Sequence, residues 1–308
     1  MGVRHADDQD PDELDPDELD RAIDASLDSL LTALALEPHG DDRFRATSER
    51  GRFDRLFGGQ QLGQAVMAAS ATVEGKDPHS LHAYFVEGGT PEEPIDLVVE
   101  RVRDGRSMST RRVTLLQGPR TLLTAIASFH ANPARPEMPS SLPDAPPPDE
   151  LPRLQDWVHD MPEERRPFGM TWVDVPPPLD LRIGEPPTFL GGAQTGGDRP
   201  HWMRVPRPVG DDPALHAALL AYASDYFLLD MVFRTHPEAI EHGRWSGSSL
   251  DHSVWFHRPV RFDQWHLHNQ RTLGIVGHRG LVQGTLHDEQ GRLVATVMQE
   301  VLARPASR

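Results

Sequence analysis

Three neighbouring residues, Asp251, His252 and Ser253, have the side chains of a serine-hydrolase triad. Adjacent residues of a strand point to opposite faces of its sheet, so the ring of His252 cannot align with the side chains of both neighbours. The string Gly243-Arg-Trp-Ser-Gly247 lacks the Gly-x-Ser-x-Gly spacing of a nucleophile elbow. The chain also has no cysteine, which excludes thiolate nucleophiles and disulfides. Neither pattern supports a covalent serine or cysteine nucleophile.

Histidine is frequent in the second half of the chain. His266 and His268 would share one face of a strand, a spacing compatible with metal binding. No carboxylate or further histidine stands at the spacing of a metal motif. We favour surface or hydrogen-bonded histidines, and we expect neither a metal nor another cofactor.

The overall charge narrows the range of partners. Acidic residues outnumber basic ones by 47 to 31, and the net charge of −16 disfavours nucleic acid as a partner because it repels phosphate backbones. Lys76 is the only lysine, and its surroundings fit neither a P-loop nor a Schiff-base enzyme. The apolar run 30–36 is far too short to cross a bilayer, and the acidic start is the reverse of a signal peptide. We expect a soluble cytoplasmic protein.

The spacing of apolar residues predicts the elements of the first half. A helix is expected over about 17–36, where leucine and isoleucine recur at helical intervals. The glycine-rich turn at 57–59 leads into a helix dense in small residues, which lets neighbouring backbone come close. Four strands follow, with the hairpin signal Asp104-Gly105 between the second and the third, at 79–86, 95–103, 107–116 and 121–130. Together they form an α+β unit.

The second half repeats this plan. A helix is expected over about 213–229 and strands at 248–258, 264–276, 279–287 and 293–302. At a shift of 171 residues, Tyr84-Phe85 falls on Trp255-Phe256. The agreement in order and length indicates an internal duplication.

Composition predicts where the domains begin and end. A short acidic repeat at the start is typical of a flexible, solvated tail. Eight prolines between residues 131 and 153 oppose both helix and sheet and predict a connection between two domains. We expect an acidic flexible tail over 1–20, a first domain over 21–131, a proline-rich linker over 132–175 and a second domain, with the catalytic residues, over 176–308.

Several strings point to a known family. Phe57-Gly-Gly-Gln60 and His79-Ser-Leu-His-Ala-Tyr-Phe85 in the first half resemble the bacterial acyl-CoA thioesterase II (TesB) family. In the second half Ala223-Ser-Asp225, Leu250-Asp-His-Ser-Val-Trp-Phe-His-Arg-Pro259 and Val297-Met-Gln-Glu300 resemble its signatures, in the same order. The resemblance covers about residues 27–304. It implies a tandem (double) hotdog of the α+β class, in which each half is a long helix wrapped by an antiparallel sheet.

The resemblance also implies three catalytic residues and a hydrolytic reaction. The helix aspartate of the family falls on Asp225, its hydroxyl residue, a threonine, on Ser249, and its glutamine on Gln299. Asp225 would activate a water molecule that attacks the carbonyl carbon of an acyl-CoA thioester, while Ser249 and Gln299 hold that water. The products are a free fatty acid and CoA, and no protein nucleophile is required.

The rest of the substrate site is expected around these residues. Backbone N–H groups at a helix start suit the developing oxyanion, and the candidates are Gly58, Gly59 and Gln60. His252 is a further candidate, through packing and hydrogen bonds rather than proton transfer. The first half shows no clear counterparts of the catalytic residues, which implies one working site per chain. By the resemblance, the acyl chain lies in an apolar tunnel and the protein forms homo-oligomers.

One segment departs from the family pattern. Val86-Glu87-Gly88-Gly89 stands where family members commonly have Leu-Arg-Pro-Gly, so a glutamate replaces an arginine. CoA carries several phosphate charges, and the chain is acidic overall. Positive charge for acyl-CoA must then come from other arginines, for which the candidates are Arg101, Arg103, Arg106, Arg111 and Arg112.

Two other functions stay open at this point. A non-catalytic acyl-CoA or fatty-acid binding protein would keep the fold and bind its ligand without hydrolysis. A hotdog hydratase acting on enoyl-CoA usually has a histidine a few residues from its aspartate, and the histidines nearest to Asp225 are His216 and His236. Thiol release from a panel of acyl-CoAs distinguishes the hydrolase from the binding protein.

Overall fold

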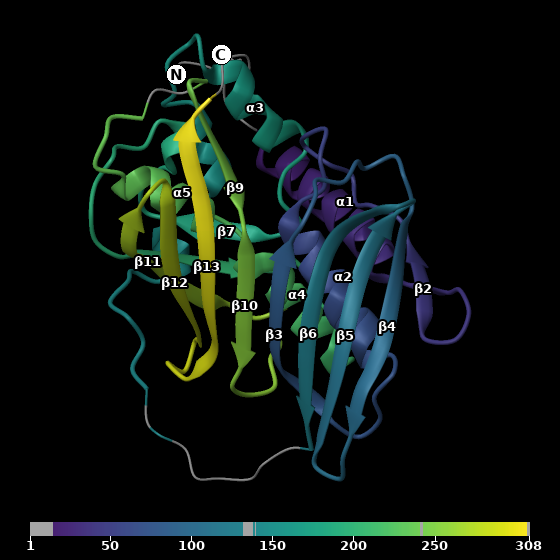
Figure 1. Ribbon diagram of the computed structural model, residues 1–308. Coiled ribbons are helices and arrows are strands. Elements are labelled where there is room, and N and C mark those ends of the chain that lie inside the picture. The colour runs from purple at the N-terminus through teal and green to yellow at the C-terminus, as the bar shows by residue number, and fades with distance from the viewer. Residues whose placement is uncertain (1–14, 132–137, 139, 241–242, 307–308) are drawn as a thin grey trace, which may run out of the picture.

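The computed structural model describes residues 15–131, 138, 140–240 and 243–306 (Figure 1). The first half contains two helices and six strands. They are α1 (Pro16–Leu34), β1 (Glu37–Pro38), β2 (Arg43–Ala46), α2 (Gly58–Ser70), β3 (Asp77–Phe85), β4 (Ile95–Asp104), β5 (Met108–Gln117) and β6 (Arg120–His130). The helix and the four strands expected after residue 56 are therefore confirmed, and the short strands β1 and β2 were not expected.

The second half contains three helices and seven strands. They are α3 (Arg166–Asp174), β7 (Asp180–Ile183), β8 (Arg199–Arg204), α4 (Pro213–Ser224), α5 (Leu228–Thr235), β9 (Trp245–Ser249), β10 (Asp251–Phe256), β11 (His266–Val276), β12 (Arg279–Asp288) and β13 (Leu293–Pro305). No helix in the described part of the chain is both long and apolar enough to cross a bilayer.

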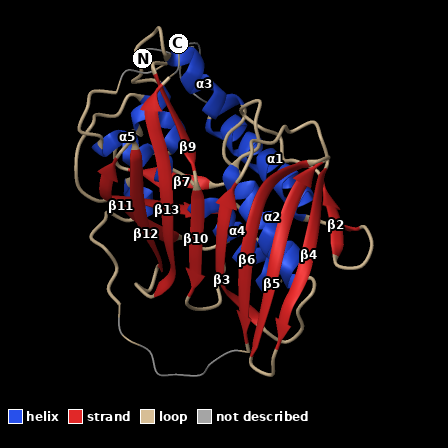
Figure 2. Ribbon diagram, viewed as in Figure 1, coloured by secondary structure: helices blue, strands red, loops and turns tan. Residues whose placement is uncertain are grey.

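The strands form one antiparallel sheet of 13 strands, in the order β1-β2-β4-β5-β6-β3-β10-β13-β12-β11-β8-β7, with β9 paired to β13 (Figure 2). The sheet continues across the two halves because β3 pairs with β10, with Leu81 opposite Val254. Outward from this pair, the order β3-β6-β5-β4 in one half matches β10-β13-β12-β11 in the other. The internal duplication and the double hotdog are thus confirmed.

The two central helices, α2 and α4, pack against each other in opposite directions behind the sheet (Figure 1). Gly59 at the start of α2 lies against the backbone carbonyl of Tyr222, near the end of α4, and Gly63 lies against that of Ala218, one turn earlier in α4. A side chain at either glycine would press on the backbone of the partner helix. The small residues of α2 therefore permit the close approach that the sequence indicated, and they bring the start of α2 to the end of α4.

The expected helix over 213–229 is wrong in its second part. α4 ends at Ser224, Asp225 is its C-cap residue, and a new helix, α5, begins at Leu228. Between them Phe227 has a left-handed backbone with φ of 68°. A residue other than glycine in this conformation breaks the helix, and here the break leaves Asp225 at an end of α4 rather than inside it.

The segment expected as a linker is largely structured, so that prediction is wrong for residues 148–175. It contains short 3-10 helices at Pro148–Glu150 and Leu154–Val158 as well as α3. Leu154, Val158 and Trp172 lie in the hydrophobic core. The prolines delimit these short elements rather than preventing them. Residues 132–137 and 139 of the expected linker lie outside the described residues.

The boundary of the expected N-terminal tail is also wrong, because α1 begins at Pro16. The side chain of Asp15 accepts a hydrogen bond from the backbone N–H of Asp17, and proline suits the first position of a helix. Leu19 and Ile23 are buried, which accounts for a helix that starts inside the acidic repeat. Residues 1–14 lie outside the described residues.

Candidate active site

The candidate site lies where the start of α2 meets the end of α4, so each half of the chain supplies one side of it. The carboxylate of Asp225 accepts a hydrogen bond from the backbone N–H of Gly59. No side chain caps α2 at Phe57. The first N–H groups of a helix have no partners within the helix and carry a partial positive charge. An uncapped helix start therefore faces the carboxylate.

Strands β9 and β13 bring the other two expected catalytic residues to this point. Gln299 on β13 donates a hydrogen bond from Nε2 to the Oγ of Ser249, at 2.7 Å. Its side chain also hydrogen bonds to the carboxylate of Asp225. Residues 225, 249 and 299, which are distant in sequence, thus form one connected group.

The carboxylate of Asp225 lies in a buried setting that raises its pKa. Burial is the largest cause, since it disfavours the charged form. Three neighbours oppose this effect, namely the charge that His252 would carry and the hydrogen bonds from Gln299 and the Gly59 N–H. A carboxylate of raised pKa is a stronger base than an ordinary one, as a proton acceptor in catalysis requires.

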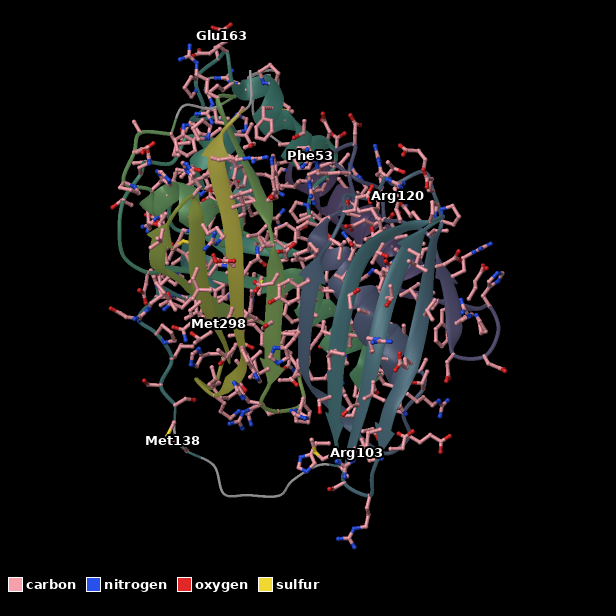
Figure 3. All side chains as sticks on the ribbon, viewed as in Figure 1. Phe53, Arg103, Arg120, Met138, Glu163 and Met298 are labelled. Carbon is pink, nitrogen blue, oxygen red and sulfur yellow. The ribbon has the colours of Figure 1, made fainter. Side chains whose placement is uncertain are left out.

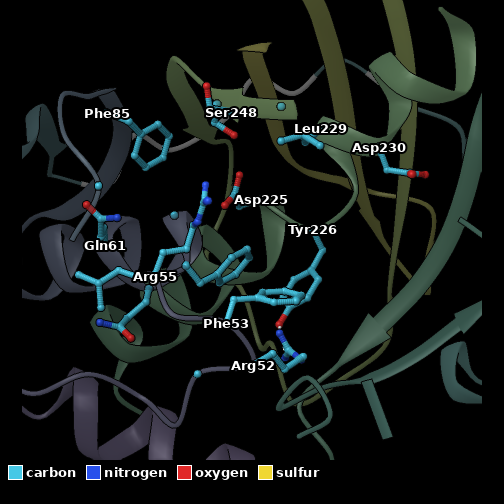
Figure 4. Close-up of a pocket in the computed structure, with 18 of the residues that line it drawn as sticks. Arg52, Phe53, Arg55, Gln61, Phe85, Asp225, Tyr226, Leu229, Asp230 and Ser248 are labelled. Carbon is cyan, nitrogen blue, oxygen red and sulfur yellow. Dashed lines mark hydrogen bonds between the residues drawn. The ribbon is translucent and has the colours of Figure 1, made fainter. Parts of the chain in front are cut away.

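Asp225 and Ser249 line a cavity of about 610 Å³. Most of the cavity wall is apolar and aromatic. The side chains of this kind include those of Phe53, Leu56, Phe57, Phe85, Phe168, Trp172, Phe189, Tyr226, Phe227, Leu229 and Phe233. In Figure 4, Asp225 lies between Ser248 on one side and Tyr226 and Arg52 on the other. The carboxylate of Asp225 therefore borders a space suited to an apolar chain.

Two expected site residues lie behind this wall rather than on it. His252 and Gln299 are both fully buried, with 0% of each side chain exposed, and neither lines the cavity. His252 therefore packs and hydrogen bonds behind the wall, as expected, and its part in binding substrate stays a prediction. Of the residues expected at the helix start, Gly58 and Gln60 line the cavity and Gly59 does not.

The residues Asp251 and Ser253 confirm that no triad forms around His252. Asp251 accepts a hydrogen bond from the backbone N–H of Glu300. Ser253 lies on the opposite face of the strand and bonds to His82. His252 instead contacts Gln299 and Ser224. The alternation of side chains along β10 separates the three residues, as expected.

The arginines expected to meet CoA are placed elsewhere, on β4, β5 and their connecting turn. Arg101 pairs with Asp42, and the buried Arg111 pairs with Asp104. Figure 3 shows Arg103 at the far end of these strands from Phe53, which marks the cavity. The positive charges at the cavity come from Arg50, Arg52 and Arg55. Sequence reasoning missed these three, although their clustering just before the Gly58-Gly59 turn was visible.

A second acid, the half-buried Glu49, lines the cavity beside these arginines. It accepts a hydrogen bond from the hydroxyl of Tyr222, at 2.8 Å. Burial raises the pKa of Glu49 to about 7, against the opposing effects of Arg52 and of the Tyr222 hydrogen bond. Arg52 in turn lies over the ring of Trp172, 4.7 Å from its centroid, and donates to the hydroxyl of Tyr226.

The histidines of the second half are mostly internal. His266 and His268 are buried, and burial lowers the pKa of His268 to about 3. Of the two expected alternatives, surface or hydrogen-bonded, both residues follow the second: His266 bonds to the carbonyl of Gln264, at 2.8 Å, and His268 to the side chain of Gln270, at 3.4 Å. Within the described ranges, no group of three or more His, Cys, Asp or Glu residues is placed to hold a metal ion.

Comparison with known families and sequences agrees with this arrangement. A family model for the acyl-CoA thioesterase N-terminal domain matches residues 47–130, and one for the C-terminal domain matches residues 139–303. The chain is 34% identical over 284 residues to acyl-coenzyme A thioesterase 8 of Homo sapiens, covering 89% of this chain and 88% of that protein. It is 31% identical over 283 residues to acyl-CoA thioesterase 2 of Haemophilus influenzae, covering 90% of this chain and 98% of that one.

Solved structures give the same result. A TesB protein of Mycobacterium avium subspecies paratuberculosis superposes with a TM-score of 0.74 at 30% identity, covering 91% of this chain and 100% of that one. An acyl-CoA thioesterase II of Mycobacterium marinum superposes with a TM-score of 0.72 at 34% identity, covering 90% and 99%. With both halves matched in order and along nearly their whole length, the chain belongs to the acyl-CoA thioesterase II (TesB) family.

Proposed function

We propose that this protein hydrolyses acyl-CoA thioesters to a free fatty acid and CoA. The observation that carries the proposal is the position of Asp225: a carboxylate of raised pKa on the wall of an apolar cavity, at the uncapped start of α2. Two hydrogen-bonding partners, Ser249 and Gln299, hold it within one connected group. The names of the relatives agree with this reaction.

The reaction proceeds through a water molecule bound between Asp225 and Ser249. As the water oxygen bonds to the carbonyl carbon, its proton passes to the Asp225 carboxylate, and the carbonyl oxygen becomes an oxyanion. The N–H groups of the first turn of α2, at Gly58 and Gln60, stabilise that oxyanion. When the tetrahedral intermediate collapses, the C–S bond breaks and Asp225 returns the proton to the departing CoA thiolate.

Gln299 has a different task from the one expected of it. Because it is fully buried and does not line the cavity, it holds Asp225 and Ser249 rather than the water itself. Its amide nitrogen can donate two hydrogen bonds, which matches its two partners. Gln299 therefore sets the distance between the two groups that bind the water.

We infer one such site in the described part of the chain, because the opposite end of the helix pair is closed. There α4 begins with Asp212, whose side chain accepts from the N–H of Ala214, and with Pro213, which has no N–H to offer. The sequence shift places Ser128 or Ala127 where the second half has Gln299. The first half therefore supplies the helix start and part of the cavity, and the second half supplies the reactive groups.

The cavity suggests how the substrate lies. Its apolar wall takes the acyl chain, and Arg50, Arg52 and Arg55 supply positive charge for the CoA phosphates near it. This arrangement compensates for Glu87, which lines the same cavity and is acidic where the family commonly has arginine. The family resemblance also implies that the protein forms homo-oligomers. This stays a prediction, and light scattering, which measures the mass of the particle in solution, would test it.

The test is release of free thiol from a panel of acyl-CoAs, followed with a chromogenic disulfide reagent. The chain has no cysteine and so adds no background. We expect release with the wild type and its collapse in Asp225→Asn, Ser249→Ala and Gln299→Ala, with Ser249→Thr retaining activity because it keeps the hydroxyl. Binding of acyl-CoA without release at any chain length would identify a non-catalytic binding protein instead.

A further inference from the structure

His252 is a buried ring that hydrogen bonds to Gln299, and both of its nitrogens have partners. Its Nδ1 atom lies 2.6 Å from the Oε1 of Gln299. Its Nε2 atom lies 3.0 Å from the Oγ of Ser224, at the end of α4. The ring therefore bridges β13 and α4, the two elements that carry Gln299 and Asp225.

The partners of Gln299 determine which way its amide faces. A carboxylate can only accept hydrogen bonds, so the atom of Gln299 that bonds to Asp225 is Nε2. The same nitrogen donates to Ser249, which uses its second hydrogen. The oxygen Oε1 must then face His252. With the amide reversed, Oε1 would lie against the carboxylate, and the two acceptors would repel each other.

This orientation determines the tautomer of His252. Oε1 is an acceptor, so a contact of 2.6 Å requires a proton on Nδ1. Burial lowers the pKa of His252, so the ring is neutral and its Nε2 carries a lone pair. The hydroxyl of Ser224 must then donate to Nε2, in preference to the carbonyl of Ala221, which lies 2.9 Å away.

We propose that His252, held by Ser224 as its Nδ1–H tautomer, is a positioning residue that locks the amide of Gln299 with both N–H groups toward Asp225 and Ser249. The inference rests on the proposed function for its effect on rate, but not for its geometry. Without the Nδ1–H donor, the contact with Asp225 alone would have to hold the amide in this orientation. A fraction of molecules would then present Oε1 to Asp225 and leave the water site misplaced.

The chain offers a matched pair of variants. In His252→Asn the amide nitrogen takes nearly the place of the ring Nδ1 and still donates to Gln299. His252→Leu has a similar size and no donor. We expect His252→Leu to lower kcat by roughly 100-fold with little change in KM, since a small misplacement of catalytic groups has an effect of this order. His252→Asn should recover most of that loss. As a control, His257→Leu, just beyond β10, should show no loss of kcat.

A double-variant cycle tests whether His252 acts through Gln299. If it does, His252→Leu adds nothing to the loss caused by Gln299→Ala, so the double variant should match Gln299→Ala alone. The proposal would be overturned if the losses of kcat in His252→Leu and Gln299→Ala multiplied in the double variant. It would also be overturned if His252→Asn and His252→Leu both folded and lost kcat equally.

The tautomer itself is measured without substrate. Long-range proton–nitrogen spectra of the full chain at neutral pH should show His252 protonated at Nδ1 only, with the signal assigned by its loss in His252→Asn. Protonation at Nε2 alone, or at both nitrogens, would contradict the proposal whatever the rates of the variants. Hydrolysis that survives Asp225→Asn would instead remove Asp225 as the base, and no hydrolysis by the wild type would remove the proposed function. Either outcome leaves the tautomer result standing.

Discussion

A methyl group placed on Gly58 would lie 2.7 Å from the Oδ2 atom of Asp225 and 3.0 Å from the ring of Phe85. Gly58 begins α2 in the first half of the chain, and Asp225 ends α4 in the second. Glycine is needed at this position because the carboxylate occupies the space of a side chain. The two halves thus meet at the proposed reaction centre with no room between them.

The first prediction concerns this contact. Gly58→Ala should lower kcat/KM by about 100-fold or more, because the new methyl group displaces the carboxylate from the water site. The protein should still fold, since the methyl group meets only side-chain ends. Gly88→Ala, at the same cavity but with open space around the added atom, is the matched control and should stay active. Equal kinetics for both variants would show that Asp225 is not held where we place it.

Gly59→Ala should affect the stability of the fold more than Gly58→Ala does. Its methyl group would strike the backbone carbonyl of Tyr222, which cannot move without shifting α4. We expect a loss of about 1–3 kcal/mol in the free energy of unfolding, as for other overpacked positions. Denaturant unfolding of Gly58→Ala and Gly59→Ala measures the contrast, and a larger loss in Gly58→Ala would contradict the helix packing described above.

The second prediction is that one substitution at Asp225 lowers the activity of the enzyme and raises the stability of its fold. Asp225→Asn should lower kcat by roughly 10²- to 10⁴-fold through loss of the general base. Because the pKa of Asp225 is raised in the folded protein, its ionisation costs stability, and that cost appears as pH rises through the folded pKa. The variant should therefore unfold at higher denaturant concentration than the wild type at pH 8. At a pH below the ordinary aspartate pKa this advantage should vanish.

The same pKa shift has a kinetic consequence. In the wild type, kcat/KM should fall as pH drops through a value above the ordinary aspartate pKa, because only the ionised carboxylate accepts a proton. Rates measured from pH 4 to pH 8 with one acyl-CoA test this. A profile that is flat throughout this range would rule out Asp225 as the base.

The third prediction concerns Glu49. Its pKa is raised to about 7, chiefly by burial, so the folded protein binds a proton that the unfolded chain would release. Stability should be greatest below pH 4.5 on account of this group and should decline as pH rises through about 7. Unfolding of Glu49→Gln between pH 5 and pH 8 should show a shallower decline than the wild type. The exposed Glu289→Gln should follow the wild type.

The fourth prediction concerns the acyl chain. Leu229 of α5 lines the cavity, so Leu229→Trp should fill part of it. We expect a rise in KM for long acyl chains, while short chains keep their kcat/KM. Leu281→Trp, at an exposed position on β12, serves as the control for the added indole. Equal effects on all chain lengths would mean that the acyl chain lies elsewhere.

Much of the fold follows from local patterns. The alternation of apolar residues predicted β3 to β6 and β10 to β13 closely, because a strand that packs one face on helices must alternate. The agreement between Tyr84-Phe85 and Trp255-Phe256 predicted the duplication, and these pairs lie on the adjacent strands β3 and β10. Elements without a clear period were missed. Arg166–Asp174 forms α3 within a proline-rich segment, where composition suggested a linker.

The sequence by itself was enough to single out Asp225, Ser249 and Gln299 as candidates, because each lies in or next to a short string typical of the family. Their contacts were beyond its reach. Only the antiparallel packing of α2 on α4 brings Gly59 to Asp225, and only the pairing of β9 with β13 brings Ser249 to Gln299. Likewise, only the packing of the whole chain places Arg52 at the cavity and Arg111 away from it. Local spacing determines which residues share a face, whereas the distance between faces depends on how the whole chain packs.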